Sequence, residues 1–296
     1  MRHGSNRKKV YLLFILPAIV WVVSFTIYPF FYSIYISFTD MSMLYPEDTH
    51  LIGLTNYVHL FGDKSFQNSV SVSFVFTTAV VLGQFLFGFL LALLMAKKRP
   101  GVSIARMSVM LPWVLPPIAL ALIWSWVLKA GNMGLINSIL VQMGIQPVSW
   151  FGTKWALFSI ILVAVWTGVP LSFMLEMASL QKIPEDIHEA SAVDGANAWQ
   201  NLIYIILPMM KDTFRINLIM ITISTIGYFD IVYAITGGGP MGKTEVLPML
   251  MYNTAFKSHS MGKGSAIAVV MLLMSVAYTL VYLLIFHEKR VTANEN

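Results

Sequence analysis

The sequence predicts an all-α integral membrane protein with six transmembrane helices. Of its 296 residues, 57% are hydrophobic and 11% are charged, and the mean hydropathy is +0.72, a balance that soluble domains do not show. Six apolar runs reach the roughly 20 residues that a helix needs to cross a hydrocarbon core of about 30 Å. These runs are 10–36, 70–96, 107–128, 155–180, 214–235 and 265–286.

The runs divide the chain into a basic N-terminus (1–9), an anchor helix (10–36), an external loop (37–69), a five-helix core (70–286) and a tail (287–296). The first run follows a basic segment, as in a signal peptide, but it is longer than a signal-peptide core and lacks a small-residue cleavage site. We therefore expect a retained helix. Cysteine is absent, which excludes disulfides, thiol catalysis and Cys-ligated metals.

The distribution of Lys and Arg predicts the orientation in the membrane, because cytoplasmic loops carry the excess of basic residues. One side collects Arg2, Arg7, Lys8, Lys9, Lys97, Lys98, Arg99, Arg106, Lys182, Lys211, Arg215, Lys289 and Arg290. The other side has Lys64, Lys129, Lys154, Lys243, Lys257 and Lys263. Both termini and the polar loop 181–212 are thus predicted to be cytoplasmic. The basic pI near 9.3 is explained by this asymmetry, and we expect no nucleic-acid partner.

The second and third runs carry residues that are typical of a tightly packed bundle. Gly83 and Gly88 lie in the second run, where small residues allow close helix contact in lipid. Gln84 is its clearly polar member, and either a bond to a neighbouring helix or a substrate contact explains it. Pro112, Pro116 and Pro117 lie in the third run and leave carbonyl groups that only protein or water can satisfy, which favours the bundle interior.

The fourth and fifth runs offer a polar surface near mid-membrane. Gly168 and Pro170 weaken the fourth helix, either as a packing kink or because the backbone lines a cavity. In the fifth run, helical spacing puts Ser224 and Tyr228 on one face with Thr225 beside them. Such a neutral, hydroxyl-rich face suits a sugar or polyol.

Asp230 is the unexpected acid of the fifth run, since a membrane span tolerates a carboxylate only when it is paired or wetted. A substrate acceptor and a structural cap near the outer surface both remain open for it.

A polar stretch of about 25 residues, 183–208, interrupts the apolar runs and predicts a helix-turn-helix, here called the elbow. Pro184 suits a first helical position. Ile187, Ala190, Ser191 and Asp194 share one helix face, and Gly195 offers the positive φ that ends helices. A second short amphipathic run extends from Trp199 to Ile206 and is closed by Pro208.

The elbow contains Glu189-Ala190-Ser191, three residues, Gly195, nine residues, Ile205, one residue and Leu207-Pro208. This arrangement resembles the coupling-loop pattern E-A-A-x3-G-x9-I-x-L-P of binding-protein-dependent ABC importer permeases, with Ser191 in place of the second Ala. The Gly238-Gly239-Pro240 loop after the fifth run is similar to the external loop of the first permease in carbohydrate importers such as those for maltose and glycerol phosphate.

The resemblance implies a type I ABC importer permease fold and a transport role. It implies a second permease, two ATP-binding subunits that hold ATP and Mg, and an external solute-binding protein, with no cofactor on this chain and a carbohydrate as substrate. The elbow would act as a lever in a cleft of the ATPase. Its implied coupling residues are Glu189, Ala190, Ser191, Asp194, Gly195, Leu207 and Pro208. A bulky β-branched residue at Gly195 is expected to uncouple ATP hydrolysis from transport.

The implied substrate contacts lie on the helices that flank the elbow. They are Thr167, Gly168, Leu171, Ser224, Thr225 and Tyr228, to which the residue analysis adds Asp230. An ion-coupled secondary transporter is the alternative class, but it usually needs buried titratable groups and inverted repeats. An enzyme is not expected, because the sequence has no H-E-x-x-H or G-x-S-x-G motif, and Gly242-Lys243-Thr244 provides only the ending of a P-loop.

Overall fold

The structure is a computed structural model, and it describes residues 14–97 and 99–286. The predicted basic N-terminus 1–9, the start of the anchor helix and the tail 287–296 lie outside the described residues. Within the described residues every regular element is a helix, and the only β-type pairing consists of two isolated bridges. The described residues form two compact units, one of residues 14–64 with 250–270 and one of residues 65–249 with 271–286. The predicted all-α class is confirmed.

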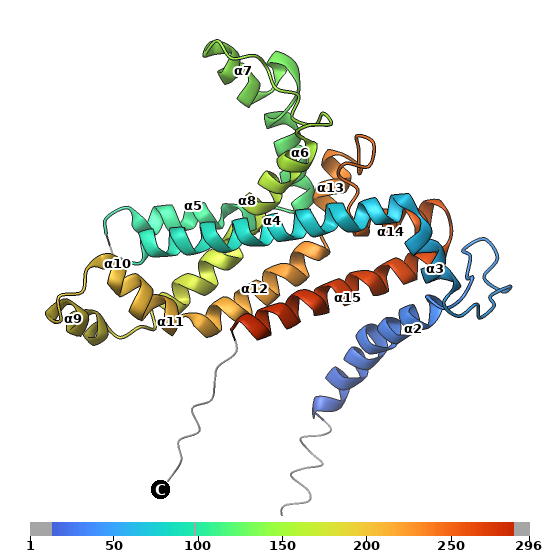
Figure 1. Cartoon of the computed structure of the whole chain (residues 1–296), viewed down its shortest axis with the longest axis horizontal. Coiled ribbons are helices and arrows are strands. Elements are labelled where there is room, and N and C mark those ends of the chain that lie inside the picture. Colours follow the sequence, from blue (N-terminus) through green and yellow to red (C-terminus); the bar gives the residue numbers. More distant parts are fainter. Residues whose placement is uncertain (1–13, 98, 287–296) are drawn as a thin grey trace, which may run out of the picture. The chain divides into compact units, whose positions relative to one another are not determined.

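Four described helices are long and apolar enough to cross a membrane. They are the helix Phe14–Ile36, which ends in η1 (Val23–Ile27) and α2 (Tyr28–Ile36), and the helices α4 (Lys64–Met95), α8 (Ala156–Leu180) and α15 (Met261–Ile285) (Figure 1). They correspond to the first, second, fourth and sixth predicted runs. At about 1.5 Å per residue α4 extends about 48 Å, so its ends project beyond the hydrocarbon core.

The third predicted run is not one straight helix. It forms α5 (Val102–Val114) and α6 (Pro117–Val127), which are bent by 104°. Leu115 and Pro116 between them have ψ values of 142° and 138°. Each of these two residues precedes a proline, and the proline ring forces the preceding residue out of the helical region. The bend is therefore encoded by the Pro116-Pro117 pair.

The prediction of one continuous fifth helix over 214–235 was wrong. The structure has α12 (Lys211–Ile226), which ends at the C-cap Gly227, and then α13 (Asp230–Ile235). Glycine is a poor helix former, and α12 with its 16 residues is shorter than the roughly 20 residues of a full span. The described helices give four spans, or five if α5 and α6 count as one, so the predicted number of six is not confirmed.

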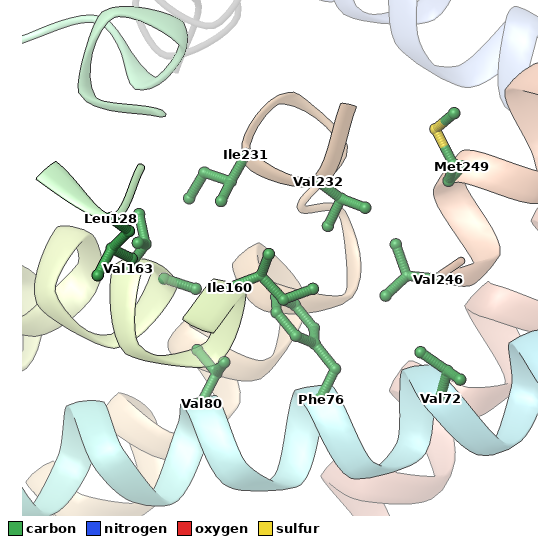
Figure 2. Packing of buried hydrophobic residues seen from close by; sticks show 11 residues of the cluster. Val72, Phe76, Val80, Leu128, Ile160, Val163, Ile231, Val232, Val246 and Met249 are labelled. Carbon is green, nitrogen blue, oxygen red and sulfur yellow. The ribbon is translucent and has the colours of Figure 1, made fainter. Parts of the chain in front are cut away.

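The core of the larger unit lies where α4, α8 and α13 meet. Val72, Phe76 and Val80 recur every four residues along one face of α4. They pack against a set of buried apolar side chains that includes Ile160, Val163, Ile231, Val232 and Val246 (Figure 2).

The glycines of α4 give it a close approach to α8, as predicted. A methyl group on Gly83 would meet the side chain of Val165, and one on Gly88 would meet Ser172 and the backbone nitrogen of Phe173. Packing of this kind replaces the hydrophobic effect as the force that joins helices in lipid.

Two short peripheral segments of the larger unit are organised by one buried amide. The short helix η2 (Gly131–Met133) is followed by α7 (Leu135–Gln142). Asn137 of α7 donates hydrogen bonds to the carbonyls of Lys129 and Val148 and accepts one from the indole of Trp150. The loop around α7 thus has a polar core of its own.

The smaller unit contains short helices of its own. These are α3 (Thr55–Gly62), the end of α14 (Leu247–Tyr252) and η4 (Asn253–Lys257). Within this unit, the buried amide of Asn56 on α3 donates to the carbonyls of Ser37 and Thr39 at 2.9 and 2.8 Å. The chain that leaves α2 is thereby fixed to α3.

Candidate functional site

The first half of the elbow is the helix α9 (Glu185–Val193), with Glu185 and Asp186 in its first turn, where the helix dipole favours negative charge. Pro184 is the N-cap and has ψ of 142°, so the prediction that it occupies the first helical position was off by one residue. Because Pro184 is extended, the helix begins at the next residue.

The end of α9 confirms the role predicted for Gly195. Gly195 has φ of +78°. Its N–H donates to the carbonyl of Ala192, and the N–H of Ala196 donates to the carbonyl of Ser191 at 2.9 Å. This pair of bonds is the Schellman motif, which satisfies the last carbonyls of a helix.

The second half of the elbow starts with a capping box. The side chain of Asn197 accepts from the backbone N–H of Gln200, and the Gln200 side chain accepts from the backbone N–H of Asn197. The short elements α10 (Ala198–Asn201), η3 (Leu202–Ile206) and α11 (Leu207–Met209) follow. Pro208 lies in the first turn of α11, just before α12 begins.

A hydrogen bond joins the two halves of the elbow. The Asn201 amide donates to the hydroxyl of Ser191 at 2.7 Å, and this hydroxyl donates to the carbonyl of His188. Ser191 is 6% exposed, so it faces the inside of the elbow. Sequence reasoning missed Asn201, because its partner lies ten residues away beyond the turn.

The predicted face of α9 lines a hollow of about 400 Å³. Its lining residues are Asp186, Ile187, Ala190, Ser191, Asp194, Ala196 and Ile205. Of the predicted coupling residues, Glu189, Ala190, Asp194, Gly195 and Pro208 are exposed, Leu207 is half-buried and Ser191 is buried. Large apolar side chains add to the outer surface, with Val193 88%, Trp199 68% and Tyr204 74% exposed.

The elbow leaves the bundle at the end where α8 stops and α12 starts (Figure 1). Ile183 and Met210, which flank it, are buried in one cluster with Ala92, Phe173, Met177, Leu180 and Phe214. The two ends of the elbow are therefore fixed in a common core.

Farther along α8 and α12, the structure brings together some of the predicted substrate residues. The Gln84 amide donates to the carbonyl of Ala164 at 3.1 Å and lies 3.4 Å from the hydroxyl of Tyr228. Gly168 lies directly against this amide, since a methyl group there would collide with it. We call Gln84, Gly168 and Tyr228 the central cluster. Gln84 thus makes the bond to a neighbouring helix that was one of its two interpretations.

The other predicted substrate residues lie in different surroundings. The hydroxyl of Thr167 donates to the carbonyl of Val163 on its own helix, and Leu171 packs beside Val81, Leu218 and Ile221. Thr225 is buried, and its hydroxyl has no hydrogen-bond partner in the described part of the chain. Ser224 is exposed.

The expectation that Ser224 and Tyr228 share a helix face was wrong. Tyr228 lies beyond the end of α12 at Ile226, and its N–H donates to the carbonyl of Thr225 in a turn. Asp230 is exposed in the first turn of α13, a position where the helix dipole stabilises a carboxylate.

A second polar group joins α8 to α12 nearer the elbow. Glu176 is fully buried and accepts a hydrogen bond from the Asn217 amide at 2.9 Å, and Ser172 donates to the Asn217 side-chain oxygen at 3.2 Å. The helices α4 and α12 cover Glu176. Asn217 is a polar residue in an apolar run, and that signal was available in the sequence.

The loop after α13 is held by side-chain hydrogen bonds. The Thr244 hydroxyl donates to the carbonyl of Gly239 and contacts the hydroxyl of Thr236 at 2.7 Å, and the Asn68 amide donates to the carbonyl of Gly242. These bonds give the glycine-rich segment a defined shape.

Comparison with known proteins identifies the family. Residues 84–291 match the family model "Binding-protein-dependent transport system inner membrane component". The chain belongs to this family. The match covers the central cluster and the elbow, so the chain is a multi-pass membrane component of a transporter rather than an enzyme.

Two curated relatives span nearly the whole chain. The trehalose/maltose transport system permease protein MalF of Thermococcus litoralis is 33% identical over 95% of each chain. The sulfoquinovosyl glycerol transport system permease protein SmoG of Agrobacterium fabrum is 32% identical over 94% of this chain and 90% of that one.

A solved structure has the same fold. A chain of a bacterial ABC transporter involved in the import of the acidic polysaccharide alginate superposes with a TM-score of 0.82, covers 99% of this chain and 100% of that one, and is 20% identical. This similarity confirms the ABC importer permease fold.

Proposed function

We propose that this chain is one of two permease subunits of an ATP-driven importer that takes up a carbohydrate delivered by an external binding protein. The observation that carries the proposal is the elbow. It has the coupling-loop pattern of such permeases, it folds into a capped helix-turn-helix, and both of its ends are buried between α8 and α12. One of the two ATP-binding subunits would receive the exposed face of α9 on the cytoplasmic side, and both termini would lie on that side too.

The central cluster supports a neutral, hydroxyl-bearing substrate. Its amide, its tyrosine and the backbone of Gly168, against which the amide packs, carry no charge. A sugar ring fits such groups, because an aromatic ring packs against its apolar C–H face and an amide forms hydrogen bonds with its hydroxyl groups. The relatives from Thermococcus and Agrobacterium, whose names give trehalose, maltose and a sulfoquinovosyl glycerol as cargo, support a carbohydrate substrate, and the sulfonate of the last shows that relatives also carry an anionic sugar.

The test is gentle solubilisation of the tagged chain from its native membrane, followed by mass spectrometry of the proteins that co-purify. We expect a second permease and an ATP-binding subunit. Glu189→Gln, on the exposed face of α9, should reduce recovery of the ATP-binding subunit. Glu185→Gln, an exposed acid in the first turn of the same helix, is the matched control and should not.

The substrate class is tested by ATP hydrolysis of the purified complex with its binding protein. Stimulation by maltose, trehalose or a glycosyl glycerol supports the proposal, and stimulation by amino acids alone contradicts the carbohydrate assignment. A chain that purifies alone, with uptake that follows an ion gradient and needs no ATPase, would instead establish a secondary transporter.

A further inference from the structure

The two helices that flank the elbow are joined by side-chain hydrogen bonds inside the bundle. Asn217 of α12 donates to Glu176 of α8 at 2.9 Å and accepts from Ser172 of α8 at 3.2 Å. All three residues are 0% exposed. One turn nearer the elbow, the hydroxyl of Thr213 donates to that of Ser179 at 2.8 Å. The pair α8 and α12 is thus held at two successive levels.

The helix α4 packs directly over this group. A methyl group on Gly88 would come within 2.9 Å of the second carboxyl oxygen of Glu176, which has no hydrogen-bond partner among the described residues. The backbone of α4 therefore fills the space where an ion or a substrate would have to bind. We call Ser172, Glu176 and Asn217 the joint. Because it is tightly packed, the joint acts on the relative movement of the helices and does not bind a ligand.

On α8 the joint lies about halfway between the elbow and the central cluster, and on α12 it lies between the elbow and the end of the helix at Ile226. Seven residues separate Glu176 from Ile183 at one end of the elbow, and seven separate Met210 at the other end from Asn217, about 10 Å along each helix. In the opposite direction, Gly168 of the central cluster and Thr225 in the last turn of α12 are each eight residues away, about 12 Å. Since the two helices are matched level by level, a shift of one past the other by a single residue rise would break both levels of hydrogen bonds.

We propose that Asn217 is a positioning residue that makes α8 and α12 one rigid lever, so that a displacement of the elbow reaches the central cluster without slippage between the helices. The inference rests on the proposed function, since the displacement comes from the ATP-binding subunits. Asn217 is the side chain suited to this role because its amide offers both a donor for the carboxyl group and an acceptor for the hydroxyl.

The direct test is a cross-link that forbids relative movement. The chain has no cysteine, so Ser179→Cys with Thr213→Cys introduces a single pair, and the 2.8 Å separation of the native hydroxyls is compatible with disulfide geometry. The sample is the complete complex in lipid nanodiscs, and the readout is ATP hydrolysis stimulated by the binding protein as purified with its native substrate. A rigid lever predicts that the oxidised complex keeps its stimulation within about twofold of the reduced one.

Loss of stimulation on oxidation, with recovery on reduction, would overturn the inference, because it would show that α8 and α12 have to move past one another. A wild-type complex that the binding protein does not stimulate would instead contradict the proposed function. The two failures are therefore distinguishable.

The second test removes the joint. Asn217→Leu should lower the ratio of stimulated to unstimulated ATP hydrolysis by at least about fivefold, the factor expected for one lost hydrogen bond, while unstimulated hydrolysis stays within twofold. Glu176→Gln keeps an oxygen for the Asn217 donor and should retain the wild-type ratio. Adding the cysteine pair to Asn217→Leu should restore the ratio under oxidation.

Ser275→Ala is the matched control, because the Ser275 hydroxyl donates to the carbonyl of Met271 within its own helix. It should leave the ratio unchanged. If Asn217→Leu lowers stimulated and unstimulated hydrolysis equally, the joint only supports folding and the lever is refuted. Should Asn217→Leu fail to assemble, the cross-link in the otherwise native complex still decides.

Discussion

Substitution of Gly195 tests whether the shape of the elbow, rather than its composition, couples the permease to its ATPase. Gly195 has φ of +78°, and a methyl group added to it would have nothing within 4 Å. The cost of a side chain is therefore purely conformational. Placing an L-residue in the left-handed region costs about 1–2 kcal/mol, and β-branching adds to it. Asn tolerates this region better than other residues.

We therefore expect Gly195→Val to shift the end of α9 and to weaken association with the ATP-binding subunit by about 5- to 30-fold. Gly195→Asn should stay close to wild type, and Gly195→Ala should lie between them. The assay is a titration of the purified ATP-binding subunit against the permease pair in nanodiscs, with thermal unfolding of the permease pair as the folding control. Equal binding by the Val and wild-type chains would refute the reasoning, and so would an Asn variant as weak as the Val variant.

Four further substitutions follow from close contacts and hydrogen bonds. Gly88→Ala forces a methyl group against the backbone of α8 and should destabilise the permease by about 1–3 kcal/mol in thermal unfolding. Gly83→Ala places its methyl group against the side chain of Val165 and should destabilise the permease less. A larger destabilisation by Gly83→Ala than by Gly88→Ala would contradict the packing. Ser191→Ala removes the hydrogen bond from α10, so hydrogen exchange should report an elbow weaker by about 0.5–1.5 kcal/mol, and unchanged exchange would show that the bond contributes nothing. Gly168→Ala displaces the Gln84 amide, so uptake should fall about tenfold at normal complex assembly, and wild-type uptake would remove the central cluster from the transport path.

Features set by neighbours in the sequence could be predicted from it. The helix α9, its end at Gly195 and the apolar faces of α4 and α8 depend on residues within one or two helical turns. The bend at Pro116-Pro117 was foreseen only as weakened hydrogen bonding, because the direction and size of a bend depend on what α6 packs against. The break at Gly227 was missed, since a single glycine inside an apolar run is also compatible with a continuous helix.

The polar contacts between helices could not be derived from the sequence. Asn217 lies 41 residues from Glu176 and Gln84 lies 144 residues from Tyr228, and no local pattern gives the relative rotation of two such helices. The sequence shows that a polar residue in an apolar run needs a partner. Only the packing of the helices determines which one it finds.

The shape of the elbow is determined by interactions within one short contiguous segment. Its helix end, its capping box and the tie from Asn201 to Ser191 are all made by residues 184–201. The outward side chains, such as Val193 and Trp199, take no part in these bonds. Under the proposed function, the contact with an ATP-binding subunit can therefore change through outward residues alone, while the bonds that shape the elbow stay intact.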